Sequence, residues 1–106
     1  MSTALNAILE HALRFNYERY RIEELIKQGA DVHQHNDHLL ACAVLDNNIE
    51  MADYLIVHHG MRVTEKQHIF ISTKYGYVEM LEYLKRAITL QRRNDKLKEH
   101  IKCQMK

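Results

Sequence analysis

Histidine is the residue type in this chain most suited to chemistry. The 106-residue sequence contains eight histidines, and His33, His35 and His38 fall within one stretch of six residues. His58 and His59 form an adjacent pair further along. Imidazoles bind transition metals and change charge near neutral pH. The pattern therefore allows a metal site, a pH-sensitive surface, or plain surface-loop histidines. We favour the last interpretation and expect no metal and no other cofactor.

The two cysteines differ in their sequence surroundings. Cys42 lies in the apolar run 39–44, which predicts a buried thiol, whereas Cys103 lies among lysines, which predicts an exposed one. Such a pair does not form a disulfide framework and fits a reducing compartment. Cys42 beside a histidine could form a nucleophilic pair, but a small residue in an apolar run more often belongs to a core. Neither cysteine is expected to complete a metal site with residues 33–38.

Catalytic motifs are missing from the sequence. The chain has three glycines and no proline, and it contains neither a Gly-rich phosphate loop nor a Gly-x-Ser-x-Gly elbow. It also lacks the Cys-x-x-Cys and His-Glu-x-x-His metal motifs. We therefore expect a protein that is not an enzyme.

An internal repeat indicates the elements that must position these side chains. Residues 40–55 match residues 69–84 at an offset of 29, with Asn47 aligned to Gly76 at a central turn. Asn and Gly both tolerate left-handed backbone. Apolar residues with helical spacing lie on either side of the turn, and proline-free sequence favours helices. Each copy is therefore predicted to be a helix-turn-helix pair.

A third, weaker copy lies upstream. Leu9, Ala12 and Asn16 correspond to Leu40, Ala43 and Asn47, and the second segment of this copy stops at Gly29, a plausible helix C-cap. One helix pair cannot bury its apolar face alone, whereas three stacked pairs can. The predicted fold is therefore all-α, a stack of three helix-turn-helix repeats with a C-terminal capping or extending helix.

These residues resemble the ankyrin repeat family. The run Leu25–Val32, which ends in Gly-Ala-Asp-Val, looks like the end of one ankyrin repeat, and residues 36–55 look like the next. The resemblance covers the chain up to about Ala87. The period here is 29 to 31 residues instead of about 33, and the Thr-Pro pair of the family is absent. Short loops are therefore expected where the family places its β-hairpin fingers.

The resemblance implies a scaffold that binds other proteins on a concave face. Phe15, Leu45 and Tyr75 are spaced by 30 residues and are expected either to form an apolar row on that face or to pack as core. Aromatic residues at an interface centre commonly dominate binding energy. The expected partner-binding residues on the first helices and the loops are Arg14, Phe15, Leu45, Asp46, Lys74, Tyr75, His33, His35 and Arg62.

The C-terminal segment differs in charge from the rest. Residues 1–84 hold 7 Lys and Arg against 12 Asp and Glu, about −5, whereas residues 85–106 hold 8 against 2, about +6. We expect repeats at 1–32, 33–63 and 64–89, followed by a basic helix at 90–106. Leu90, Leu97, Ile101 and Met105 share one face of that helix. We favour a break near Thr89 or residues 94–95 that lets the last segment fold back as a cap; a continuous helix is the alternative.

The expected function is protein binding that occludes a partner's surface, as a small viral or phage-type inhibitor of a host complex would do. The alternatives are association with nucleic acid through the basic helix, or a homodimeric adaptor built on that helix. No run of about 18 apolar residues is present, so we expect no membrane span. The N-terminus does not resemble a secretory signal, which favours a cytoplasmic location.

Overall fold

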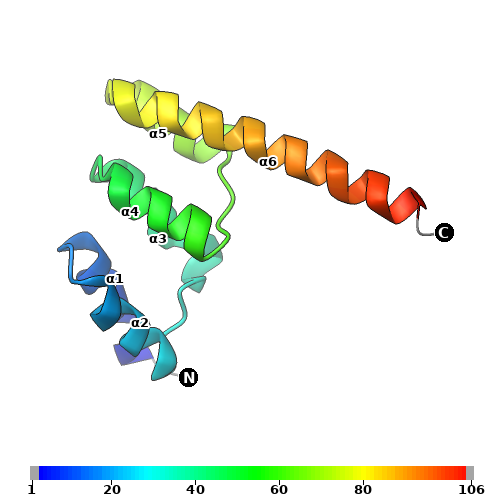
Figure 1. Ribbon diagram of the computed structural model, residues 1–106. Coiled ribbons are helices and arrows are strands. Elements are labelled where there is room, and N and C mark those ends of the chain that lie inside the picture. The colour runs from blue at the N-terminus through cyan, green and yellow to red at the C-terminus, as the bar shows by residue number, and fades with distance from the viewer. Residues whose placement is uncertain (1–2, 105–106) are drawn as a thin grey trace. The chain divides into compact units, whose positions relative to one another are not determined.

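The computed structural model describes the backbone of residues 3–104 and the side chains of residues 3–99. That part of the chain contains helices and turns but no β-strand, so the all-α prediction is confirmed. None of its helices combines the length and the apolar character needed to cross a membrane. The elements, which Figure 1 traces, are α1 (Thr3–Arg14), α2 (Arg19–Lys27), α3 (Gln34–Leu45), α4 (Ile49–Asp53), the π-helical turns η1 (Tyr54–His58) and η2 (Glu65–Ile69), α5 (Phe70–Lys74) and α6 (Val78–Gln104).

The chain divides into two compact units, Met1–Met61 and Arg62–Lys106. In the first unit α1 contacts α2 and α3, and α3 contacts α4 and η1. In the second unit α5 and η2 both contact α6. The first unit thus holds two helix pairs and the second holds one (Figure 1). The sequence-based boundaries at residues 32, 63 and 89 stay predictions.

The turn within each pair has one geometry, repeated three times. Asn16, Asn47 and Gly76 all have left-handed backbone, with φ of 56°, 53° and 68°. The amide of the following residue reaches back five residues in each copy, as Tyr17 does to the Ala12 carbonyl at 2.9 Å. This is the Schellman arrangement, which satisfies the last carbonyls of the first helix. The predicted left-handed turns at these positions are confirmed.

Small residues stand at the carbonyl end of each of these hydrogen bonds. Ala12 and Ala43 are buried, and Ser72 is fully buried with its hydroxyl bonded to the carbonyls of His68 and Ile69. Leu40 and Leu55, the two ends of the repeated segment 40–55, are also fully buried. Each buried leucine contributes roughly 1.5–3 kcal/mol through the hydrophobic effect. The small residues and the leucines that recur in the sequence repeat therefore form part of the core.

The first residues of α3 form a short left-handed turn. His35, Asn36 and Asp37 have φ of 50°, 55° and 62°, one after another. Left-handed backbone costs roughly 1–2 kcal/mol per non-glycine residue, although Asn, Asp and His tolerate it better than most residues do. The buried side chain of Gln34 anchors the turn by donating to the backbone carbonyls of Asn6 and Asp31. The chain therefore has a short left-handed turn at the start of α3 and no β-hairpin there.

The last helix, α6, runs from Val78 to Gln104 without interruption, so the prediction that the chain breaks and folds back is wrong. The segment contains no proline or glycine that would end a helix. Thr89, a proposed breaking point, bonds its hydroxyl to the Lys85 carbonyl inside the helix. The helix has two faces, as expected: Leu84 and Ile88 are buried, whereas Leu90 and Leu97 are each 55% exposed. The side chains of Ile101, Cys103 and Met105 lie outside the described part.

Candidate functional site

An ion pair joins the ends of α1 and α3, which are the first helices of the two helix pairs in the first unit. The Arg14 guanidinium donates from Nε to Asp46 Oδ2 at 3.0 Å and from Nη2 to Asp46 Oδ1 at 2.9 Å. Because two hydrogen bonds join the guanidinium to the carboxylate, the contact fixes the relative orientation of these groups better than a single hydrogen bond does. Both side chains are partly exposed, at 42% and 30%, so the pair adds at most about 1 kcal/mol of stability. Its main consequence is to hold two predicted binding residues in one geometry.

Two exposed apolar side chains flank this ion pair in sequence. Phe15 is 68% exposed and Leu45 is 39% exposed, so neither is a core residue. Phe15 directly precedes the left-handed Asn16, and Leu45 lies two residues before the left-handed Asn47, so both lie where a helix ends. The Phe15 ring packs against His11 with centroids 4.4 Å apart. Arg14, Phe15 and Asp46 also line one open hollow, together with Ala7, Glu10 and His11.

The corresponding residues of the second unit are also exposed. Tyr75 is 53% exposed and stacks on Tyr77 at 5.8 Å between ring centroids. The Lys74 ammonium lies 5.7 Å from the centre of the Tyr75 ring, within the range of a cation–π contact. The end of α5 therefore presents an aromatic side chain with a cation beside it.

The loop residues expected to bind a partner have contacts within the chain. His33 Nδ1 lies 2.6 Å from the Asp37 carboxylate, and its backbone amide donates to Asp31 Oδ1 at 2.9 Å. His35 sits in the left-handed turn, exposed, with its ring edge-on to His38. Arg62 pairs with Asp95 of α6 at 2.6 Å. Arg62 therefore helps to attach α6 within the second unit.

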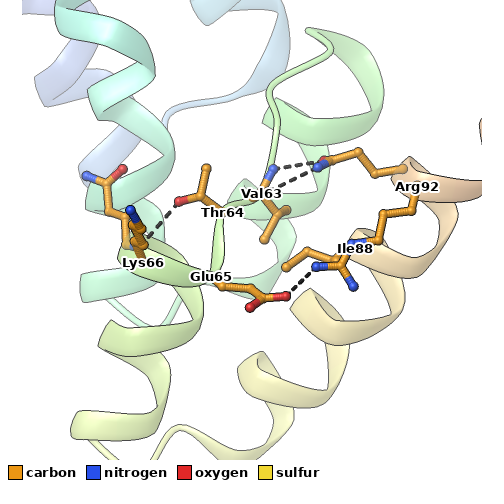
Figure 2. A pocket seen from close by; sticks show the side chains of 8 residues that line it. Val63, Thr64, Glu65, Lys66, Ile88 and Arg92 are labelled. Atoms are coloured by element: carbon orange, nitrogen blue, oxygen red, sulfur yellow. Dashed lines mark hydrogen bonds and ion pairs between the residues drawn. The ribbon is translucent and has the colours of Figure 1, made fainter. Parts of the chain in front are cut away.

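A hollow of about 610 Å³ lies beside this attachment, between η2 and α6. Figure 2 shows Glu65 and Arg92 joined across it, with Val63 and Ile88 on its wall. The Gln91 side chain bonds both backbone groups of Val63, accepting from its amide at 2.9 Å and donating to its carbonyl at 3.0 Å. These contacts explain why the helix continues past residue 89.

Cys42 lies beside His38 and Glu10, with ligand atoms within 4.8 Å of one another, although neither cysteine was expected to join the histidines of residues 33–38. His38 Nε2 lies 3.2 Å from Cys42 Sγ and 3.6 Å from Glu10 Oε1. The same ring nitrogen faces both groups, whereas a nucleophilic relay needs opposite nitrogens for thiol and carboxylate. Burial also raises the pKa of the Cys42 thiol, and only the thiolate is a strong nucleophile. The arrangement does not support nucleophilic catalysis by Cys42.

A second cluster joins His58 and His59 to Glu23 of α2. The Tyr54 hydroxyl donates to Glu23 Oε1, and this bond lowers the pKa of Glu23. Burial in turn raises the pKa of Tyr54. The adjacent histidines were visible in the sequence, but Glu23 lies more than 30 residues away on another helix. No spacing rule connects these positions.

Known proteins offer no guide to the site. No protein-family model, curated protein or solved structure matches the chain.

Proposed function

We propose that this chain is a divergent ankyrin-type repeat protein. It binds a partner protein with the C-terminal ends of the first helix of each pair, which are α1, α3 and α5. In the first unit this surface consists of Arg14, Phe15, Leu45 and Asp46, which we name the helix-end surface. Binding there acts sterically, by covering part of the partner, and involves no catalysis. In the second unit Tyr75 occupies the position of Phe15, directly before the left-handed residue of the turn.

The observation that carries this proposal is the exposure of Phe15 and Leu45 on two neighbouring helices. Large apolar side chains that are exposed at neighbouring helix ends and rimmed by charged groups are typical of interaction sites. The Arg14–Asp46 pair fixes both helix ends before any partner arrives. A prearranged surface loses less conformational entropy on binding, which increases affinity.

The three identical turns support the repeat interpretation. Asn16, Asn47 and Gly76 share one backbone geometry at sequence offsets of 31 and 29. Equivalent turns place the preceding side chains in equivalent positions on each pair. A repeat protein uses such a series of positions as its binding surface.

The test is a pull-down from nuclease-treated lysate of the native source, followed by titration of the captured protein. Phe15→Ser combined with Leu45→Ser should weaken binding at least about thirtyfold, because one central side chain contributes roughly 2 kcal/mol. Tyr20→Ser combined with Val57→Ser is the matched control, since these side chains are 64% and 74% exposed in the same unit. The control should bind as the unmodified protein does.

Circular dichroism must show both double variants folded. Equal loss in the two variants, or full binding by the Phe15/Leu45 variant, would contradict the helix-end surface. Tyr75→Ser, measured separately, shows whether the second unit contributes. Capture that depends on nucleic acid would instead favour the basic helix α6.

A further inference from the structure

Three side chains with metal-binding atoms meet on one side of the first unit. Glu23 Oε1 lies 3.0 Å from His59 Nε2 and 3.4 Å from His58 Nε2. All three atoms lie within 4.8 Å of one another. His59 is largely buried, with 13% of its side chain exposed, whereas His58 and Glu23 are exposed to 59% and 35%. The cluster therefore has one inner ligand and an open outer side.

The π-helical turn η1 brings both histidines to the same place. In a regular α-helix consecutive side chains diverge by about 100°, so adjacent histidines point apart. In a π-turn the hydrogen bonds join residues i and i+5, so residues i+4 and i+5 both lie near residue i. Accordingly the Tyr54 ring stacks on His58 at 5.3 Å and meets His59 edge-on at 5.0 Å. Such turns are frequent at functional sites.

We propose that Glu23, His58 and His59 bind a divalent transition-metal ion of the zinc class. Nitrogen and oxygen ligands lie roughly 2.0–2.2 Å from zinc, which places neighbouring ligands in a tetrahedron about 3.3 Å apart. The two contacts of Glu23, at 3.0 and 3.4 Å, match this separation. Two imidazoles favour zinc, copper, iron or nickel over magnesium or calcium, which prefer oxygen ligands.

Tyr54 orients two of the three proposed ligands through its hydroxyl group. Its hydroxyl donates to Glu23 Oε1 and lies 3.0 Å from His59 Nε2. Arg19 holds the tyrosine from its ring face, with Cζ 4.6 Å from the ring centre, and donates to Met51 Sδ. Groups that orient metal ligands in this way commonly change affinity tenfold to a hundredfold when they are removed.

The open side of the cluster leaves one coordination position for water or for a partner's side chain. Three protein ligands and one open position are typical of zinc sites that exchange ligands, whereas purely structural sites have four protein ligands. The ion would also join α2 to the end of η1, two elements that are distant in sequence. Metal binding should therefore stabilise the first unit as well.

The test is calorimetric titration of the purified, chelator-treated full chain with Zn²⁺ near pH 7.5. The expected result is one ion per chain, with binding weakened at least about tenfold by His58→Gln or Glu23→Gln. His58 is mostly exposed, so its substitution should not disturb folding. Tyr54→Phe should weaken binding to a smaller extent. Substitution with Co²⁺ should produce the visible absorption of a tetrahedral site.

His38→Gln is the matched control, because His38 belongs to the separate cluster with Glu10 and Cys42. This variant should bind Zn²⁺ as the unmodified chain does. The proposal is overturned if the chain binds no Zn²⁺, if His58→Gln and Glu23→Gln bind it normally, or if only His38→Gln loses it. A rise in melting temperature with Zn²⁺, absent in folded His58→Gln, provides a second readout.

Discussion

Cys42 is buried to 2% exposure, and this burial raises the pKa of its thiol. Its sulfur nevertheless lies 3.2 Å from a ring nitrogen of His38, which is as close as the thiol and imidazole of a nucleophilic Cys–His pair would be. The environment decides between these roles, because a raised pKa leaves the protonated thiol dominant at neutral pH. Cys42 is therefore a core residue with one polar contact.

Alkylation checks this view of Cys42. In a Cys103→Ser variant, iodoacetamide at pH 7.5 should modify native Cys42 at least about tenfold more slowly than the same chain in denaturant, where the thiol has its ordinary pKa of about 8.5. The native rate should rise only when the pH is increased well above that value. Equal rates in the native and denatured chains would contradict both the burial and the raised pKa.

The sequence predicted the burial of Cys42 but not its neighbours. The four-residue spacing of His38 and Cys42 places them on one helical face, so their contact could have been found from the sequence. Glu10 could not, because it comes from α1, and only the packing of α1 on α3 brings it close. The contact of Glu23 with His58 and His59 could not be predicted either, because it also depends on the packing of separate elements.

Among the helices and turns, the three turns within the helix pairs follow most directly from the sequence. Left-handed backbone suits Asn and Gly, and all three turns use one or the other. The turns were therefore predictable from residue type and repeat alignment. The continuity of α6 was not, because it depends on contacts of Gln91 and Arg92 with Val63 and Glu65.

Substitution of Asn47 tests the turn. With φ of 53°, Asn47→Gly should be more stable than Asn47→Ala by about 1 kcal/mol, because only alanine carries a Cβ that crowds left-handed backbone. Urea denaturation measures the difference. Glu50 is exposed inside α4, and there the order should reverse, with alanine more stable than glycine by about 1 kcal/mol. The same order at both sites would contradict the turn geometry.

Removal of Gln91 tests the attachment of α6 in the second unit. Gln91→Ala leaves the amide and carbonyl of buried Val63 without their side-chain partner, which should cost roughly 1–3 kcal/mol. Arg93→Ala on the exposed side of the same helix should change stability little. Thermal denaturation followed by circular dichroism compares the two. Equal stability of both variants would mean that the hydrogen bonds to Val63 contribute nothing.

At the scale of the whole molecule, charge and apolar exposure are distributed in different ways. The basic C-terminal helix uses part of its charge inside the second unit, where Arg92 pairs with Glu65. The helix-end surface of the first unit, by contrast, combines the exposed apolar side chains of Phe15 and Leu45 with the Arg14–Asp46 ion pair. We assign binding to the helix-end surface because its exposed side chains lie beside an ion pair that fixes both helix ends.

The most direct test of partner binding places a photoreactive benzoylphenylalanine at Phe15 and, as a control, at Phe70. Both side chains are well exposed, at 68% and 60%, but only Phe15 belongs to the helix-end surface. Irradiation in native lysate should join one protein of defined mass to the chain from position 15 and not from position 70. Equal crosslinking from both positions, or crosslinking from position 70 alone, would contradict the proposed surface.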